Sequence, residues 1–283
     1  MTSLIDWIVQ PFTFDFMLRG LAAGILIGIS CAVLGAFVVL RGMAFIGDAM
    51  AHTILPGIVI AFLSGANLTL GALIAAVVTA LGIGWFSREG QVREDTAIGV
   101  TFSGLFALGI LLLSRVQSYR DLTHILFGNI LGVTVPDLAI IAGVTVVVLI
   151  AVSLSYKELL VTSFDPGHAI SIGLSPSAVR YGLLLLLALT VVTAIQAVGV
   201  VMVVALLVTP AATANLLTRR LRPIMGLAAL FSAVAALIGL YASYYAGVAS
   251  GATIVLALTG MFVLAFLFAP GRGWVQRTRR RRA

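Results

Sequence analysis

Charge is scarce in this sequence. Only 10% of its 283 residues are charged, whereas 61% are apolar, and the mean hydropathy is +1.18. Ordinary soluble domains carry about 25% charged residues, so this composition excludes a typical soluble enzyme or binding module. Apolar runs of about 20 residues recur along the chain, which is the pattern of a helical protein that crosses a membrane several times.

Cysteine and lysine are almost absent. The single cysteine, Cys31, has no partner for an intrachain disulfide, and the single lysine, Lys157, lies in the sequence SYKELL. A Walker A phosphate loop requires lysine after a glycine-rich turn and before serine or threonine. The chain therefore lacks this loop, and any ATP-driven activity would need an ATPase on another chain.

Basic residues are missing from the first 18 positions, which excludes a cleavable signal peptide because such peptides begin with a positively charged segment. Residues 1–16 contain Trp7, Phe12, Phe14 and Phe16 instead. Aromatic residues collect where a membrane meets water, so this stretch is predicted to be a short interfacial segment.

The apolar runs predict an all-α polytopic membrane protein with a single transmembrane domain over residues 1–283 and about nine transmembrane helices, with eight to ten possible. The spans are expected at 17–40, 43–64, 68–86, 96–114, 136–155, 179–197, 198–217, 224–247 and 250–269. Between the fourth and fifth spans, LTHILFGNILGV is too short to cross and predicts a re-entrant or interfacial helix. His124 within it is expected to be a surface histidine.

The distribution of arginine predicts how the chain is oriented in the membrane. Six arginines lie between Arg272 and Arg282, directly after the last span. Such a cluster could bind nucleic acid, but its position favours a basic cytoplasmic tail, residues 271–283, on anionic lipid. Counting back through nine spans places Arg219, Lys157 and Arg41 inside and the N-terminus outside.

One span, within residues 42–63, carries a carboxylate and an imidazole that a lipid-facing helix would not tolerate. Asp48 and His52 are four residues apart, so both leave the same face of a helix and could grip one cation. The alternative is a buried Asp–His pair that hydrogen-bonds two helices together. Pro56 is expected to kink the helix and free the His52 carbonyl, which favours a metal or gating site.

Glycine gives this helix a possible close neighbour. Gly47 and Gly57 would let another backbone approach, and a symmetry-related copy of the same helix is the expected partner. A metal site with only two side-chain ligands per chain would be completed by that copy, by solvent or by both.

The longest cytoplasmic connection, residues 156–180, predicts a short helix on the membrane surface. Asp165 is placed to cap it, Pro166 to occupy its first position and Gly173 to end it. The segment from Phe164 onward is either a docking element or an ordinary capped surface helix. His168 is expected to be solvated.

Two further positions are candidates for gating. Asp95 follows Glu94 at the start of the span that begins at residue 96. The simpler interpretation is that these carboxylates stabilise the helix N-terminus, and the alternative is a role at an inner gate. Pro210 lies in the middle of the span 198–217 and predicts a second kink.

Several motifs resemble the permease subunits of bacterial ABC importers for manganese, zinc and iron. They are FVVLRGMAFIGDAMAH, GDAMAHTILPGIVIAF, REDTAIGVTFS, HILFGNILGV, SFDPGHAISIGL and QAVGVVMVVALLVTPAATA, in the order expected of that family. Together they cover nearly the whole chain. The LPG after His52, with LFGNILGV, is closer to the manganese/iron branch than to the zinc branch.

The resemblance implies a type II ABC importer-like permease in the bacterial plasma (inner) membrane. It implies a homodimer, two cytoplasmic ATPase subunits and an extracytoplasmic metal-binding lipoprotein. It also implies that Asp48 and His52 carry the ion, and that Phe164, Asp165, Pro166 and Gly173 belong to the helix that contacts the ATPase. The transported ion would be Mn²⁺ before Zn²⁺ or Fe²⁺, with no permanently bound cofactor and no nucleic acid.

Three alternatives remain at this point. A secondary transporter driven by protons or sodium usually has several intramembrane carboxylates, whereas Asp48 is the one clear acidic residue deep in a span. An intramembrane metalloenzyme would need more histidine, cysteine and acidic ligands than the sequence groups together. A permease for a metal chelate would need a wider and less charged pathway.

Overall fold

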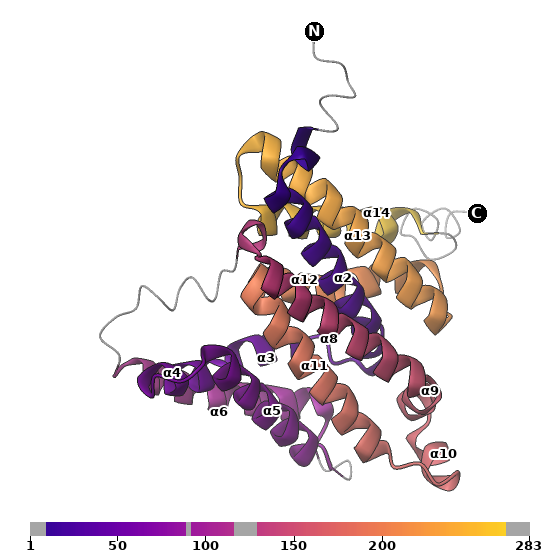
Figure 1. Ribbon diagram of the computed structural model, residues 1–283. Coiled ribbons are helices and arrows are strands. Elements are labelled where there is room, and N and C mark those ends of the chain that lie inside the picture. Colours follow the sequence, from indigo (N-terminus) through magenta and orange to yellow (C-terminus); the bar gives the residue numbers. More distant parts are fainter. Residues whose placement is uncertain (1–9, 89–91, 116–128, 270–283) are drawn as a thin grey trace, which may run out of the picture.

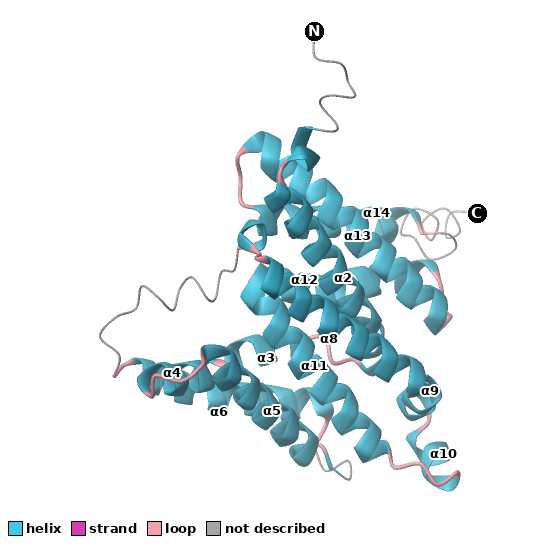
Figure 2. Cartoon of the chain, in the orientation of Figure 1, coloured by secondary structure: helices cyan, strands magenta, loops and turns pink. Residues whose placement is uncertain are grey.

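The computed structural model describes residues 10–88, 92–115 and 129–269, and the regular elements within these ranges are all helical (Figure 1 and Figure 2). In chain order they are η1 (Gln10–Thr13), α2 (Asp15–Arg41), α3 (Ile46–Thr53), α4 (Leu55–Leu63), α5 (Leu68–Phe86), α6 (Glu94–Leu113), η3 (Ile130–Gly132), α8 (Val135–Leu154), α9 (Tyr156–Phe164), α10 (Pro166–Ser171), α11 (Pro176–Val198), α12 (Val200–Leu217), α13 (Leu221–Ala246) and α14 (Ser250–Phe268).

Nine helical segments in the described part of the chain are long and apolar enough to cross a membrane. One of them, Ile46–Leu63, comprises α3 and α4, and the others are single helices. This confirms the predicted all-α membrane fold and its nine spans. The boundaries differ from prediction by a few residues, as in the first span, observed as Asp15–Arg41.

Helix α2 lies inside the larger of two groups of helices, which also contains α8 and α11 to α14 (Figure 1). Small residues allow this central position. Gly20, Gly24 and Gly28 face Ile130 of η3, Ala236 and Ser232, so a Cβ at Gly28 would lie only 2.8 Å from the Ser232 Cβ. The four-residue glycine spacing therefore forms a close packing face on α2.

Helices α3 to α6 form the second group, at the lower left of Figure 1. Helices α4 and α5 meet at Gly57 and Gly71, where a Cβ on either glycine would collide with the backbone carbonyl of the other. Helix α5 joins this group to α11, where Gly84 lies against the ring of Tyr181.

The predicted partner for the glycines of the α3–α4 span was wrong. Gly57 approaches Gly71 of the same chain, and Gly47 lies against the side chain of Leu207 in α12, where a Cβ would come within 2.8 Å of it. Both positions are thus occupied by packing within one chain, so they give no reason for a contact across a two-fold axis.

The connection from residue 156 to 180 is more ordered than expected, since its first half is helix α9. The cap of α10 is confirmed. Asp165 Oδ1 accepts a hydrogen bond from the His168 N–H at 2.8 Å, and Pro166 is the first residue of the helix. Gly173 has φ +82°, a left-handed conformation that suits glycine, and turns the chain toward α11.

Aromatic side chains gather where α2 begins and α13 ends. The ring of Phe12 lies 5.5 Å from that of Tyr241, and the ring of Phe14 lies 6.0 Å from that of Tyr244. This grouping fits the interfacial role predicted for the N-terminal segment, as far as residues 10–16 are concerned.

Some predictions fall on residues outside the described ranges. They concern Trp7, most of the LTHILFGNILGV segment with His124, and the arginine-rich tail. They stay predictions.

Candidate metal site

Asp48 and His52 lie one turn apart on α3, with His52 Nε2 3.5 Å from Asp48 Oδ1. Their side chains are 46% and 34% exposed, respectively, whereas Met50 between them is fully buried. Helix α3 therefore turns one face into the protein and presents the Asp48–His52 pair on the other. Among the residues that the structure describes, neither side chain has a hydrogen bond to another helix.

The span that carries the pair is divided at Ile54. Helix α3 ends at Thr53, and α4 begins at Leu55 with Pro56 in its first turn. Because Pro56 has no N–H, it cannot donate to the carbonyl of His52, four residues earlier. The Ile54 N–H is directed at that carbonyl instead. A role for the carbonyl in metal binding stays a prediction.

Two phenylalanines of α6 form a wall behind the imidazole. The ring of His52 lies 5.2 Å from that of Phe106 and 6.0 Å from that of Phe102. The two phenylalanine rings are stacked, 5.6 Å apart and 10° from parallel. Contacts of this kind restrict the orientation of the histidine ring while its Nε2 stays directed toward Asp48.

One chain offers an incomplete set of metal ligands. Within the described ranges, no three histidine, cysteine, aspartate or glutamate side chains are grouped closely enough to hold a metal ion. A carboxylate and an imidazole suit Mn²⁺, Fe²⁺ or Zn²⁺, but these ions take four to six ligands. Further ligands must therefore come from the backbone, from solvent or from another chain.

Arg41 joins α2, the helix before the pair, to α9. As the last residue of α2, it donates from Nε to Ser163 Oγ and from an Nη to Thr162 Oγ1 of α9, both at 3.0 Å. Asp48 follows only seven residues later. A displacement of α9 would thus act on the start of the segment that leads into α3.

Arg180 makes the corresponding contact on the other side of α10. From α11 it donates to the Ser87 carbonyl at 2.9 Å and pairs with Glu94 of α6 at 3.5 Å. Helix α6 also carries the wall of Phe102 and Phe106. Arg41 thus ties α9 to the end of α2, and Arg180 ties the start of α11, which follows α10, to Ser87 and to the start of α6.

The segment α9–α10 presents an apolar surface outside the predicted membrane spans. Phe164 is 65% exposed, as is Ile170, and Ile172 is 54% exposed. Apolar side chains gathered outside the membrane need a covering partner. His168 is exposed, and Asp165, Pro166 and Gly173 shape the helix that displays this surface.

The two gating candidates lie on other helices than the Asp48–His52 pair, Asp95 on α6 and Pro210 on α12. Asp95 is exposed in the first turn of α6, about 10 Å along the helix from Phe102. Glu94 and Asp95 both lie in the first turn, where their charge suits the helix N-terminus as expected, but Arg93 occupies the N-cap position and no side-chain cap bond forms. Pro210 is buried inside α12, which continues as one helix past it. Neither observation tests a gating role.

Sequence reasoning missed the contacts of Phe102, Phe106, Arg41 and Arg180. The two phenylalanines have helical spacing, but lipid-facing apolar residues in the same span look identical in sequence. Arg41 and Arg180 contributed only as markers of orientation, since their partners lie more than 80 residues away in the chain.

Comparison with known proteins gives a consistent result. Residues 13–269 match the model of the ABC 3 transport family. The chain is 46% identical over 278 residues to the manganese transport system membrane protein MntC of Halalkalibacterium halodurans, covering 98% of this chain and 95% of the relative. It is 40% identical over 266 residues to a "Probable iron transport system membrane protein" of Haemophilus influenzae, covering 94% and 98%.

A solved structure shares this fold. The chain is similar to PsaBC from Streptococcus pneumoniae in complex with Fab, with a TM-score of 0.83 and 37% sequence identity. The match covers 97% of this chain and 99% of the solved chain.

Proposed function

The chain belongs to the ABC 3 transport family, and on that premise we propose that it is the membrane-spanning subunit of an ATP-driven importer for a divalent metal ion. Manganese is the foremost substrate, because several relatives are named for manganese transport, and Fe²⁺ and Zn²⁺ suit the same ligands. The protein is a multi-pass plasma membrane permease. It transports the metal and does not retain it as a cofactor.

The observation that carries the proposal is the Asp48–His52 pair on the divided span. The two side chains are 3.5 Å apart and lie on the exposed face of α3. The aromatic wall on α6 restricts the orientation of the imidazole. A divalent cation offsets the cost of an ionised carboxylate at this depth, and it binds the neutral form of histidine. The pair therefore binds the permeating ion during its passage.

A second copy of the chain would complete this site. The outward orientation and partial exposure of the pair support a homodimer in which each copy contributes Asp48 and His52. Two pairs would provide the four ligands that zinc needs, and solvent would supply the rest of a six-coordinate manganese site.

Separate ATPase subunits would supply the energy, since the sequence has no Walker A motif. The exposed apolar side chains of α9–α10 support this segment as their docking site, with Phe164, Asp165, Pro166 and Gly173 as its defining residues. Arg41 and Arg180 would transmit movement of the docked segment toward α3 and α6. An extracytoplasmic metal-binding lipoprotein would deliver the ion.

The test is metal uptake in a strain that lacks its own importer and expresses the permease with its ATPase and lipoprotein. Asp48→Asn keeps the shape of the side chain and removes its charge, so uptake should fall at least about 100-fold, as expected for loss of a direct ligand. His52→Ala should have a similar effect. Membrane expression of each variant is measured alongside.

His168→Ala is the matched control for His52→Ala, because His168 is exposed on α10, and it should leave uptake unchanged. Wild-type uptake by Asp48→Asn would exclude the metal site. Full uptake without the ATPase would instead favour the alternative of a secondary transporter driven by an ion gradient.

A further inference from the structure

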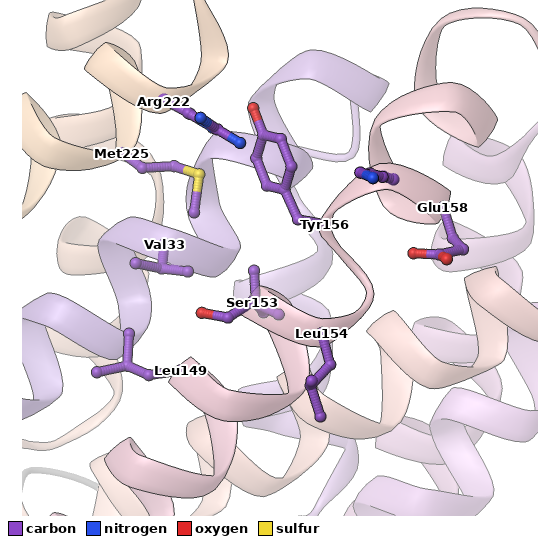
Figure 3. A pocket seen from close by; sticks show the side chains of 10 residues that line it. Val33, Leu149, Ser153, Leu154, Tyr156, Glu158, Arg222 and Met225 are labelled. Carbon is purple, nitrogen blue, oxygen red and sulfur yellow. The ribbon is translucent and has the colours of Figure 1, made fainter.

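A cavity of about 540 Å³ lies where α2, α8, α9 and α13 meet, far from the Asp48–His52 pair in the chain (Figure 3). We infer that it binds one glycerophospholipid whose headgroup carries a phosphate and a hydrogen-bond donor, with the upper part of an acyl chain on its apolar wall. The lining residues are Val33, Leu149, Val152, Ser153, Leu154, Tyr156, Lys157, Glu158, Arg222 and Met225.

The position of the cavity suits a lipid of the inner leaflet. It opens between the end of α8 and the start of α13, and the predicted orientation puts both at the cytoplasmic boundary of the membrane. Leu154, the last residue of α8, is 78% exposed at its edge, as expected of a side chain in contact with lipid. Basic pockets between transmembrane helices on this side are typical sites for lipid headgroups.

Two cations would hold the phosphate. The guanidinium of Arg222, a lining residue, lies over the ring of Tyr156, 5.0 Å from its centroid, and Figure 3 shows the two side by side. This cation–π contact restrains the guanidinium, and its N–H groups can still donate two hydrogen bonds to phosphate oxygens. Neither Arg222 nor Lys157 has an acidic partner within 4.0 Å among the residues that the structure describes.

Glu158 is the reason to expect a hydrogen-bond donor in the lipid headgroup. Its Oε2 is buried and has no hydrogen-bond partner within the described structure, although Glu158 lines the same cavity. A buried acceptor left without a donor is costly, so the occupant should provide one. The hydroxyls of a phosphatidylglycerol headgroup or the ammonium of phosphatidylethanolamine would do so, whereas the quaternary ammonium of phosphatidylcholine has no hydrogen to donate.

The apolar wall separates a lipid from a soluble phosphate compound. Val33, Leu149 and Met225 face the cavity from three different helices, opposite Glu158 in Figure 3. Water against these side chains is unfavourable, and an acyl chain would replace it. A volume of about 540 Å³ is far more than a phosphate ion fills.

The experiment is native mass spectrometry of the full-length permease, purified in detergent, stripped of lipid and titrated with phosphatidylglycerol, phosphatidylethanolamine or phosphatidylcholine. We expect one tightly bound phosphatidylglycerol or phosphatidylethanolamine per chain and weaker binding of phosphatidylcholine, which has no headgroup donor. Arg222→Gln should weaken phosphatidylglycerol binding about fivefold or more. Ser153→Trp, which places a large ring in the cavity, should abolish the tight site.

Arg220→Gln is the matched control, because Arg220 is exposed in the same turn but does not line the cavity, and its binding should equal wild type. Equal binding by wild type, Arg222→Gln and Ser153→Trp would overturn the proposal. Displacement of the lipid by millimolar inorganic phosphate would also overturn it, in favour of a free-anion site. None of these results depends on metal transport.

Discussion

At the scale of single residues, the proposed metal site depends on how the His52 ring is held. The imidazole lies between Asp48, which sets the direction of Nε2, and the phenylalanine wall of α6. Metal ligands lose affinity when the groups that orient them are removed, even though those groups do not touch the ion. Phe106 is the closer of the two phenylalanines and is therefore the residue to change.

Phe106→Ala should raise the metal concentration for half-maximal uptake about two- to tenfold, because an aromatic contact of this kind contributes about 0.5–1.5 kcal/mol. Initial uptake rates over a range of Mn²⁺ concentrations measure this. Phe266→Ala on α14 is a matched control, since Phe266 also stacks on a phenylalanine one turn away, Phe262, but on an outer helix. Identical kinetics of the two variants would mean that the wall does not orient His52.

At the scale of elements, the sequence predicts well those features that depend on residues close to one another in the chain. The apolar runs predict the helices, the i, i+4 spacing predicts the shared face of Asp48 and His52, and Asp165 with Pro166 predicts the start of α10. Contacts between elements are not encoded in this way. Gly57 shows that a close neighbour exists, but only the packing of α4 on α5 shows that the neighbour is Gly71.

The caps of α10 allow a test of coupling. Asp165→Lys combined with Gly173→Pro removes the bond to the His168 N–H and places proline where φ is +82°, so both ends of the helix should be lost. We expect a membrane-inserted permease that no longer co-purifies with its ATPase and no longer transports.

Asp165→Asn is the control for this double variant, because asparagine also caps helices well, and it should keep the ATPase bound. Co-purification of the ATPase with the double variant at wild-type level would show that α10 is not part of the docking surface.

At the scale of the whole molecule, the described basic side chains concentrate at one set of helix ends. Arg41, Arg93, Arg180 and Arg222 lie at ends that nine spans place in the cytoplasm. At the opposite ends, the turns 64–67 and 247–249 contain no charged residue, and the described basic residues there are Arg19 and Arg115. This asymmetry follows the positive-inside rule and supports an N-terminus outside the cell.

Cysteine substitution tests this orientation. Ser64→Cys lies in the exposed turn between α4 and α5 and should react with an impermeant thiol reagent in intact cells, whereas Ser171→Cys on α10 should react only after the membrane is opened. The native Cys31 is fully buried and should contribute no background. Reaction of Ser171→Cys in intact cells would reverse the topology.

The division of the α3–α4 span has a consequence for how well the site separates ions of different radius. The eight-residue helix α3 lies between Gly42, whose φ is +72°, and the interruption at Ile54, while α4 beyond it is fixed to α5 by the Gly57–Gly71 contact. The side chains of Asp48 and His52 are partly exposed on this short segment, so their rotamers can adjust to the small difference in ligand distance between Mn²⁺ and Zn²⁺. We therefore expect the permease alone to accept both ions, so that excess Zn²⁺ competes for a lipid-reconstituted permease–ATPase complex even when the delivery protein is left out.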